Sequence, residues 1–423
     1  MKKQLGSALL LAAVVTACSD SSTNPMASAN LAPMAASAAD PSVQQIPNEY
    51  MVVLKKGSDL QGEVARVRGL GAEVMDQWQH ALLGYSVRIS GAQLNALRAS
   101  KAIAWVEPNA VMHVSTVYPC SAGGYANCSW GLDRISESSL PMDGNYVISN
   151  AAPSHGANTT AYSIDTGILL THAEFGGRAR FGADFIRVPP APGDDHGHGT
   201  HTSGTIGGAT YGVAKSVQLV SVKVCNSGGS CPTTAIVNGV NFVTADAATH
   251  KPAVANMSLG GSANATIDAA VTNSIASGIV YGIAAGNSFG LDACTQSPAR
   301  VPTAITVGAT GSFDGLVPPA SPDDRASYSN IGTCLDIFAP GSQIKSSWNT
   351  SNTATNIISG TSMATPHVVG VAALYLSEKP TKTVAQVTAA IVGHATNGVV
   401  TNAGAGSPNK LLNSSLPTIA WQQ

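Results

Sequence analysis

Residues 359–376, near the C-terminal end of the chain, read SGTSMATPHVVGVAALYL. The apolar second half of this stretch predicts a buried helix, and Gly360 and Thr361 are placed to begin it. Ser362 then lies in the first turn, where unpaired backbone N–H groups and the positive end of the helix dipole favour negative charge. Ser362 is therefore either a common first-turn serine or a nucleophile beside which a developing anion is stabilised.

The composition limits the partners that the chain can bind. Its 423 residues are enough for two or three domains, one of them with a large core. Only 11% of the residues are charged, against about 25% in average soluble proteins, so uncharged polar residues must carry the surface. The net charge is −2 and no basic run follows Lys2 and Lys3, which excludes a nucleic-acid partner.

The first residues form an export signal. A positive start, MKKQ, is followed by LGSALLLAAVVTA, an apolar segment too short to cross a bilayer comfortably. Its end, Val15–Cys18, resembles the bacterial lipobox, in which the cysteine is lipidated; the alternative is ordinary cleavage near Ala17. We assign residues 1–18 to a signal peptide with Cys18 as the candidate lipidation site. We expect an extracellular or periplasmic protein that meets a membrane only through this lipid.

Two segments of different character follow the signal. Residues 19–47 are rich in Ser, Ala, Asn and Pro, and they predict a disordered tether because they cannot bury enough apolar surface to fold. Residues 48–116 alternate strand-like and helical stretches in the order βαββαβ of a ferredoxin-like unit. This unit is either a regulatory module or a prosegment, and its place between an export signal and a cysteine-bearing domain favours the prosegment.

Six further cysteines follow Cys18, and an even number in an exported chain indicates disulfides. Their spacing is not the CxxC repeat of zinc sites. The sequence permits fifteen connectivities. Two close pairs each flank a Gly-rich loop, and the favoured pairing is Cys120 with Cys128, Cys225 with Cys231, and Cys294 with Cys334.

Residues 117–423 predict one large α/β domain. Apolar strand-like runs such as TTAYSID alternate with helical patterns, which is typical of a doubly wound, mostly parallel sheet covered on both faces. Sites in such sheets lie at the carboxyl ends of the strands. Asp165 ends TTAYSID and is therefore either a site carboxylate or an ordinary turn aspartate.

Three histidines follow closely in the segment DDHGHGTHTSG. His196, His198 and His201 form an HxHxxH pattern, which invites a zinc-dependent hydrolase. Thr200 stands where such enzymes have an aspartate, and this difference counts against zinc. Gly197 and Gly199 instead allow the backbone around His198 to approach a substrate or another loop closely.

Asp165, His198 and Ser362 together are the residue types of a serine nucleophile activated by a histidine base and a carboxylate. A serine hydroxyl needs a base to take its proton, and a neutral imidazole can do this near neutral pH. A buried carboxylate fixes the tautomer of the imidazole and stabilises the imidazolium. The order Asp, His, Ser along the chain differs from that of chymotrypsin and of the α/β-hydrolases.

Five motifs now resemble those of subtilisin-like serine proteases. They are SIDTGI around Asp165, HGHGTHTSG around His198, NMSLGG at 256–261, AAGN at 284–287 and SGTSMATPH around Ser362. WGLDRI at 130–135 and PNKLL near the end resemble the proteinase K and aqualysin branch. The resemblance implies a secreted, monomeric serine endopeptidase made as a self-processing zymogen. Its prosegment would be an intramolecular inhibitor cut near Thr116. A non-catalytic binding protein on this fold has little support, since no catalytic position is substituted.

The resemblance also implies roles for other residues. Asn287 would donate to the oxyanion beside the backbone N–H of Ser362. A pocket for the large apolar or aromatic residue before the cut would have two walls, Ser258, Leu259, Gly260 and Gly261 on one side and Ala284, Ala285 and Gly286 on the other. An edge that pairs with substrate would be formed by Asn226, Ser227 and Gly228.

The resemblance implies a structural calcium ion and no organic cofactor. The carbonyl groups of Pro302 and Ala304 and the carboxylate of Asp336 resemble the calcium ligands of proteinase K, and hard oxygen ligands suit this ion. His196 departs from the asparagine common in relatives. It either tunes the pKa of His198 or lines the rim of the site.

Overall fold

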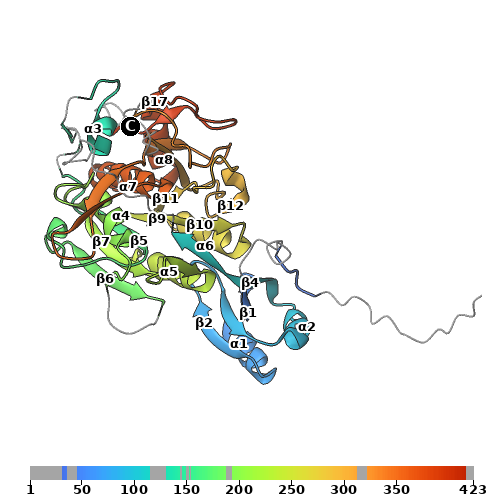
Figure 1. Ribbon diagram of the computed structural model, residues 1–423. Coiled ribbons are helices and arrows are strands. Elements are labelled where there is room, and N and C mark those ends of the chain that lie inside the picture. The colour runs from blue at the N-terminus through green and yellow to red at the C-terminus, as the bar shows by residue number, and fades with distance from the viewer. Residues whose placement is uncertain are drawn as a thin grey trace, which may run out of the picture.

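The structure is a computed structural model that describes residues 31–35, 45–114, 130–142, 145–148, 152, 154–186, 193–311 and 322–415 (Figure 1). It contains a small N-terminal unit, residues 45–114, and a large domain that begins at Trp130. The two units pack directly against each other. Cys18, Thr116, Cys120 and Cys128 lie outside the described residues, so the expectations about them stay predictions.

The N-terminal unit has the predicted order βαββαβ. Its sheet has the strand order β4-β1-β3-β2 with antiparallel neighbours. Helix α1 begins where the Asp59 side chain accepts a hydrogen bond from Gly62 N, and it buries Leu60, Val64 and Val67 on the sheet. The bounds are β1 Gln45–Leu54, α1 Leu60–Gly69, β2 Glu73–Trp78, β3 Gly84–Arg88, α2 Leu94–Arg98 and β4 Ile103–Val114. This confirms the ferredoxin-like topology.

A short segment ahead of this unit corrects the predicted extent of the tether. Residues 31–35 lie inside the segment expected to be disordered, yet they run parallel to β4 along its outer edge, with a bridge between Met34 and Val106. Val106 N donates to Pro33 O at 3.0 Å and Ala35 N donates to Val106 O at 2.9 Å. The segment is ordered because the strand edge supplies backbone partners and because Ala32 is buried in the core of the unit. We call residues 31–35 the strap.

The large domain contains a nine-stranded sheet with the order β17-β18-β14-β13-β11-β9-β5-β7-β6. Neighbouring strands are parallel except β17 and β18, which confirms the doubly wound α/β fold. The strands are β5 Thr160–Asp165, β6 Ala179–Asp184, β7 Gln218–Lys223, β9 Ala253–Met257, β11 Val280–Ala284, β13 Ile305–Thr310, β14 Ile337–Pro340, β17 Thr396–Asn397 and β18 Lys410–Leu411.

Helices cover both faces of this sheet because its strands are apolar on both sides. Tyr162 and Ile164 of β5 belong to the core under α5 and α6, whereas Ala161 belongs to the core under α4, α7 and α8. The helices of the domain are α3 Trp130–Ser136, α4 His198–Gly207, α5 Thr233–Asp246, α6 Ala265–Ala276, α7 Thr361–Glu378 and α8 Val384–His394. In such a sheet, the helices that follow strands begin at the carboxyl ends of the strands.

The second half of β4 leaves the N-terminal unit and enters the large domain. It lies between β8 (Ser230–Pro232) and β10 (Leu259–Ser262), both antiparallel to it, and β12 (Gln296–Ser297) continues this sheet beyond β10. Figure 1 shows β4 running from the N-terminal unit toward β10 and α6. A hairpin of β15 (Ile344–Ser347) and β16 (Thr355–Ile358) packs on α4.

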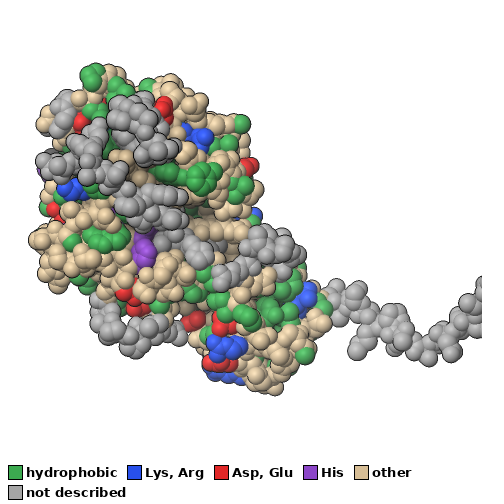
Figure 2. Space-filling model, in the orientation of Figure 1, with side chains coloured by type: hydrophobic (Ala, Val, Ile, Leu, Met, Phe, Trp, Pro, Cys, Tyr) green, Lys and Arg blue, Asp and Glu red, His purple; other side chains and the backbone are tan. Residues whose placement is uncertain are grey.

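The surface agrees with the low charge of the sequence. Figure 2 shows that much of the visible face of the large domain is uncharged, while Lys, Arg, Asp and Glu side chains gather on the N-terminal unit. Among the helices in the described ranges, none combines the length and the apolar character that a bilayer span requires.

Candidate active site

Asp165 and His198 form a buried hydrogen-bonded pair. Asp165 ends the central strand β5, and its Oδ1 lies 2.8 Å from His198 Nδ1 at the start of α4. Both side chains are 0% exposed. Asp165 Oδ1 also accepts from Thr166 N at 2.7 Å, and Oδ2 accepts from the Thr202 hydroxyl at 3.3 Å. These bonds hold the carboxylate in place and orient the imidazole, whose Nε2 has no hydrogen-bond partner among the described residues.

Ser362 lies in the first turn of α7, as the sequence predicts. Helix α7 packs directly against α4, which carries His198. The Ser362 hydroxyl donates to Ser258 O at 3.1 Å rather than to His198, and the Ser258 hydroxyl donates to Ser362 O at 2.8 Å. The structure therefore brings Asp165 and His198 into contact and holds Ser362 on the neighbouring helix, bonded to the segment that leads into β10.

Asp194 organises the loop before His198, and the sequence analysis assigned it no role. Its Oδ1 accepts from the Thr166 hydroxyl at 2.8 Å and from Gly197 N at 2.8 Å, and its Oδ2 accepts from Thr200 N and the Thr200 hydroxyl. Thr166 in turn accepts from Gly199 N at 2.8 Å. Asp194 thus ties the turn after Asp165 to the start of α4. The signal in the sequence was the acidic pair that precedes HGHGTH.

Gly197 and Gly199 make the close approach that the sequence predicts for them. Gly197 has φ +110°, a left-handed conformation, and a Cβ there would lie 2.5 Å from the Trp348 ring. A Cβ on Gly199 would lie 2.2 Å from Gly167 O. The glycines therefore let α4 begin directly against the loop that follows Asp165.

The three histidines are committed to separate partners, and the zinc alternative has no support. His201 Nε2 lies 3.0 Å from Ile344 O, and its ring meets the edge of Trp348. His196 Nδ1 accepts from His198 N at 3.3 Å. Within the described ranges, no group of three or more His, Cys, Asp or Glu side chains is arranged to hold a metal.

His196 and His201 both favour the neutral form. Burial lowers the pKa of His196, and a positive charge on His198 lowers it further. Burial lowers the pKa of His201 to about 3. Both rings are therefore uncharged at neutral pH.

Asn287 is held by the same helix that carries Ser362. Its Oδ1 accepts from Thr361 N at 2.9 Å and from the Thr361 hydroxyl at 2.8 Å. Gly286, with φ +101°, turns the chain after β11 so that this contact can form. Because Oδ1 is occupied, the amide N–H groups of Asn287 are the donors that this side chain can offer to an anion.

The second half of β4 pairs along both edges with strands of the large domain, and we call the space between β8 and β10 that it fills the cleft. On one side, Gly260 of β10 pairs with His113 and Leu259 pairs with Val114. On the other side, the pairing strand is β8, which starts at Ser230. Thus Leu259 and Gly260 pair with β4 on one side and Ser230–Pro232 pair with it on the other, while the substrate contacts expected of Leu259, Gly260 and Asn226–Gly228 stay predictions.

The loop at residues 226–229 closes on itself just before β8. Asn226 N donates to Ser230 O at 2.9 Å, and Asn226 Oδ1 accepts from Gly228 N and Ser230 N. These bonds use the backbone groups that the sequence analysis expected to face substrate. The edge that faces β4 therefore begins only where the turn ends, at Ser230.

Two side chains of β4 cap helices of the large domain, and the sequence analysis missed both. The Glu107 carboxylate accepts from Ala265 N at 3.0 Å and from Thr266 N at 2.6 Å, at the start of α6. The Asn109 side chain accepts from Thr234 N at 3.1 Å, at the start of α5. Both are buried, with Glu107 at 0% and Asn109 at 1% exposure. Alternate residues of one strand thus satisfy two helix ends.

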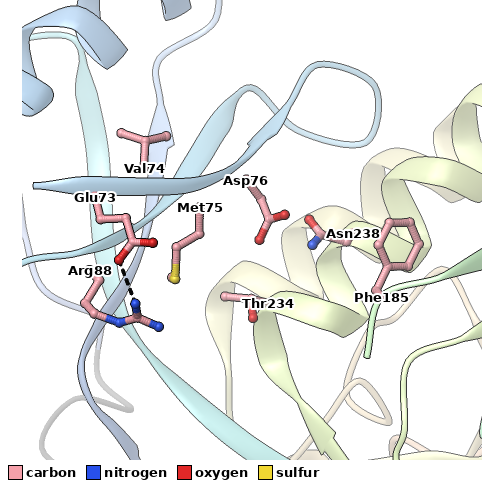
Figure 3. Close-up of a pocket in the computed structure, with 8 residues that line it drawn as sticks. All are labelled: Glu73, Val74, Met75, Asp76, Arg88, Phe185, Thr234 and Asn238. Carbon is pink, nitrogen blue, oxygen red and sulfur yellow. Dashed lines mark hydrogen bonds and ion pairs between the residues drawn. The ribbon is translucent and has the colours of Figure 1, made fainter. Parts of the chain in front are cut away.

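Another part of the contact between the two units is open and polar. Figure 3 shows a hollow between β2 and β3 of the N-terminal unit and α5 of the large domain, with Thr234 and Asn238 on the α5 side. On the other side, Glu73 and Arg88 form an ion pair at 2.6 Å. Val74, Met75 and Phe185 also line the hollow. The Glu73–Arg88 pair is exposed and lies within the N-terminal unit, so the buried contacts of β4 contribute more to cohesion than this pair does.

The predicted disulfides of the described residues are present. Cys225 pairs with Cys231, and Cys294 pairs with Cys334. A buried lysine, Lys223, lies beside the first of these bonds. Its ammonium group donates to Thr166 O at 2.6 Å, to Asp195 Oδ1 at 2.6 Å and to Cys225 O at 2.8 Å. Lys223 therefore links the loops after Asp165 and before His198 to this disulfide.

The candidate calcium residues lie near the ends of β13 and β14. Pro302 and Ala304 belong to the turn before β13, and Asp336 directly precedes β14. The Asp336 carboxylate accepts from Thr306 N at 2.8 Å. Burial raises the pKa of Asp336 to about 6. A buried carboxyl group in this state is poorly matched by protein charges and is suited to a bound cation.

Comparisons with known proteins agree with this geometry. Residues 156–411 match the model of the subtilase family of S8 peptidases. The chain is 44% identical to an extracellular serine proteinase of Thermus sp. strain Rt41A over 421 residues, which cover 94% of this chain and 96% of that protein. It is 45% identical to alkaline serine exoprotease A of Vibrio alginolyticus over 84% of this chain and 63% of that protein. A crystal structure of a cold-adapted subtilisin-like serine proteinase matches with a TM-score of 0.61 and 47% identity, covering 68% of this chain and 99% of that one.

Proposed function

The chain belongs to the subtilase family and is a serine-type peptidase, and from this premise we propose which residues hydrolyse the peptide bond. Ser362 is the nucleophile, His198 is the base that takes its proton, and Asp165 orients the imidazole. The observation that carries this assignment is the fully buried Asp165–His198 pair. His198 lies on α4, which packs against α7, and its Nε2 has no hydrogen-bond partner among the described residues. If the Ser362 hydroxyl turned from Ser258 O to His198 Nε2, the three side chains would form one continuous series of hydrogen bonds.

The reaction then proceeds through an acyl-enzyme. His198 accepts the proton of Ser362 as the hydroxyl attacks the carbonyl carbon, and the imidazolium returns it to the leaving amine. The oxyanion receives hydrogen bonds from the amide of Asn287 and the backbone N–H of Ser362. Water repeats the sequence to release the second product. The bonds from Thr361 to Asn287 support this role, because they aim the amide before substrate arrives.

We infer that the substrates are extended polypeptides cut internally after large apolar or aromatic residues. The walls of the pocket at Ser258–Gly261 and Ala284–Gly286 carry small side chains apart from Leu259, and they leave room for a large one. An antiparallel partner on both sides, as β4 has, is the geometry that a bound peptide would adopt.

We propose that residues 48–116 are an inhibitory prosegment. The support is that β4 fills the cleft and caps α5 and α6 through Asn109 and Glu107. Thr116, near which we expect the cut, is the second residue after β4. N-terminal sequencing of the mature enzyme tests this, and a mature chain that begins before β4 would contradict it.

Calcium stabilises subtilases generally, and we propose Pro302, Ala304 and Asp336 as ligands here. Bound calcium would offset the unfavourable charge of the buried Asp336 carboxylate. Thermal unfolding provides a test independent of activity. With chelator at pH 8, Asp336→Asn should unfold at a higher temperature than the parent chain; with calcium, the order should reverse. The same order in both buffers would remove Asp336 from the site.

We propose that the chain is secreted, as its relatives named extracellular are, and that Cys18 carries a lipid that anchors only the precursor. Immunoblots of membrane and culture fractions test this. Lipid on the mature enzyme would contradict the proposal.

A serine-directed phosphonyl reagent tests the central assignment. It should label the mature enzyme on Ser362, in proportion to the loss of activity on casein. Labelling should be absent from Ser362→Ala and from heat-unfolded enzyme. Full activity in an excess of reagent would overturn the proposed nucleophile.

A further inference from the structure

The Cys225–Cys231 disulfide joins two places of different function. Cys231 is the central residue of β8 and pairs with Met112 of the strand that fills the cleft. Cys225 follows the end of β7. Both cysteines are 0% exposed, so the bond belongs to the interior and does not lie on a mobile surface loop.

The Cys225 end of this bond is fixed to the strand that carries Asp165. Cys225 N and Val224 N both donate to Asp165 O, at 3.2 and 2.8 Å. Cys225 O accepts from the buried ammonium group of Lys223, which also holds Thr166 O. One end of the disulfide therefore cannot move without moving the backbone around Asp165.

The Cys231 end carries the edge that faces β4. Ser230 pairs with His113 and Pro232 pairs with Val111, on either side of the cysteine. The turn between the two cysteines is closed by Asn226, which bonds Ser230 through backbone and side chain. A covalent bond and a closed turn thus fix the position of the short strand β8. The backbone groups of β8 are therefore in place before a strand pairs with them.

We propose that the Cys225–Cys231 disulfide is a specificity determinant, which makes β8 a preformed strip for the residues on the N-terminal side of the cut. An edge that is already ordered loses less conformational entropy when a strand pairs with it. The favoured substrates are consequently polypeptides with several residues before the scissile bond, and short amides gain nothing from the strip. This inference rests on the proposed function and adds a length requirement to it.

The test compares two substrates in two disulfide variants. One substrate is a succinylated tetrapeptide p-nitroanilide, and the other is an N-acylated single-residue p-nitroanilide with the same residue before the cut. In Cys225→Ala/Cys231→Ala, the ratio of kcat/KM for the long substrate to that for the short one should fall at least tenfold. In the matched control Cys294→Ala/Cys334→Ala, the ratio should stay within twofold, because that disulfide is not part of β8 or β10.

Each outcome decides the inference. Equal losses on both substrates, or an unchanged ratio, would overturn it. If the double variant does not mature, the matured control variant Cys294→Ala/Cys334→Ala is assayed with and without a thiol reductant, which opens Cys225–Cys231; a fall of the ratio on reduction supports the inference, and a constant ratio after reduction is verified by mass overturns it. Failure of the proposed function is separate, because the parent enzyme would then cleave neither substrate and would not react with the phosphonyl reagent.

Discussion

Four helices begin at the same edge of the large sheet, and they divide into two pairs by the source of their caps. At α4 and α7, the partners come from the large domain itself: Asp194 bonds Thr200 N, and Asn287 bonds Thr361 N. At α5 and α6, the N-terminal unit supplies acceptors through Asn109 and Glu107, and α6 has a further cap of its own at Asn264. The first pair carries the proposed catalytic side chains, and the second pair holds the strand that fills the cleft.

The difference separates what is permanent from what is removable. Bonds within one domain persist as long as the fold does, so the proposed catalytic groups on α4 and α7 would keep their geometry if the N-terminal unit were removed. The acceptors of Asn109 and Glu107 would leave with β4, whereas the Asn264 cap of α6 would stay. The same physical device, an acceptor at a helix N-terminus, thus serves positioning in one pair and reversible attachment in the other.

The largest effect should come from Ser362 on α7. Ser362→Ala should lower kcat by about 10⁶-fold, a magnitude taken from subtilisin, itself a member of this family. It should also leave the chain at precursor size on immunoblots, because no nucleophile remains to cut near Thr116. Normal maturation of this variant, purified from a host without other proteases, would count against the assignment.

Asn287 accepts from Thr361 N at the start of α7, and a substitution tests whether its amide also acts as a donor. Asn287→Ala should lower kcat by about 10² to 10³-fold with little change in KM, again a magnitude known from subtilisin. Asn287→Asp keeps the acceptor for Thr361 but has no N–H donor, and it should lose at least as much activity while unfolding near the parent temperature. Substantial activity in the Asp variant would mean that the residue only supports α7.

Loss of the acceptors at α5 and α6 should weaken attachment of the N-terminal unit. In the inactive Ser362→Ala precursor, Glu107→Ala with Asn109→Ala should lower the free energy of unfolding by about 2 to 4 kcal/mol, because buried donors at two helix ends lose their partners. The matched control is Glu73→Ala in the open hollow, where an exposed ion pair is worth under about 1 kcal/mol. Equal effects of the two changes, measured by urea unfolding, would end the distinction between buried caps and the hollow.

His201 on α4 should make the stability of the large domain depend on pH. Its pKa of about 3 when folded lies below the ordinary 6.5. Below pH 6.5 the unfolded chain therefore binds the proton first, and stability falls as pH drops toward 3. At pH 5 the loss from this residue is about 2 kcal/mol. In the Ser362→Ala background, His201→Leu should be less stable at pH 7.5 but should lose less on acidification. Parallel curves in urea unfolding would contradict the neutral, buried state.

The smallest effect is expected at His196, whose role the sequence left open. Because burial lowers the pKa of His196 and keeps its ring neutral, His196→Asn should move the acid limb of the kcat/KM profile by less than about 0.3 pH units. A larger shift would show that His196 carries charge in the active enzyme.

Local motifs predicted much of the fold and the candidate site. Strand β5 and helix α7 follow from apolar runs, and the pairing of Asp165 with His198 follows from two Gly-rich motifs in a recognisable order. Strand β6 escaped prediction because ARFGAD is an edge strand with little apolar alternation. Likewise, nothing near Glu107 or Asn109 in the sequence indicates that helices 120 residues or more away will need a cap.

Two further features escaped prediction for the same physical reason. The edge that pairs with β4 starts at Ser230, after a disulfide and an Asx-type turn close the preceding loop, and sequence spacing does not reveal that closure. The strap was expected to be disordered because Ala32 and Met34 have too few apolar neighbours in sequence. They gain these neighbours only from a folded partner, which composition does not describe.

The strap leaves β4 with uneven protection. The outer edge of its first half is bonded through Pro33 and Ala35, whereas its second half relies on β8 and β10. Once separated from the large domain, the N-terminal unit would present the last few residues of β4 as a newly open strand edge, a template on which identical copies could stack. Efficient destruction of the spent fragment would therefore also protect the culture from aggregates.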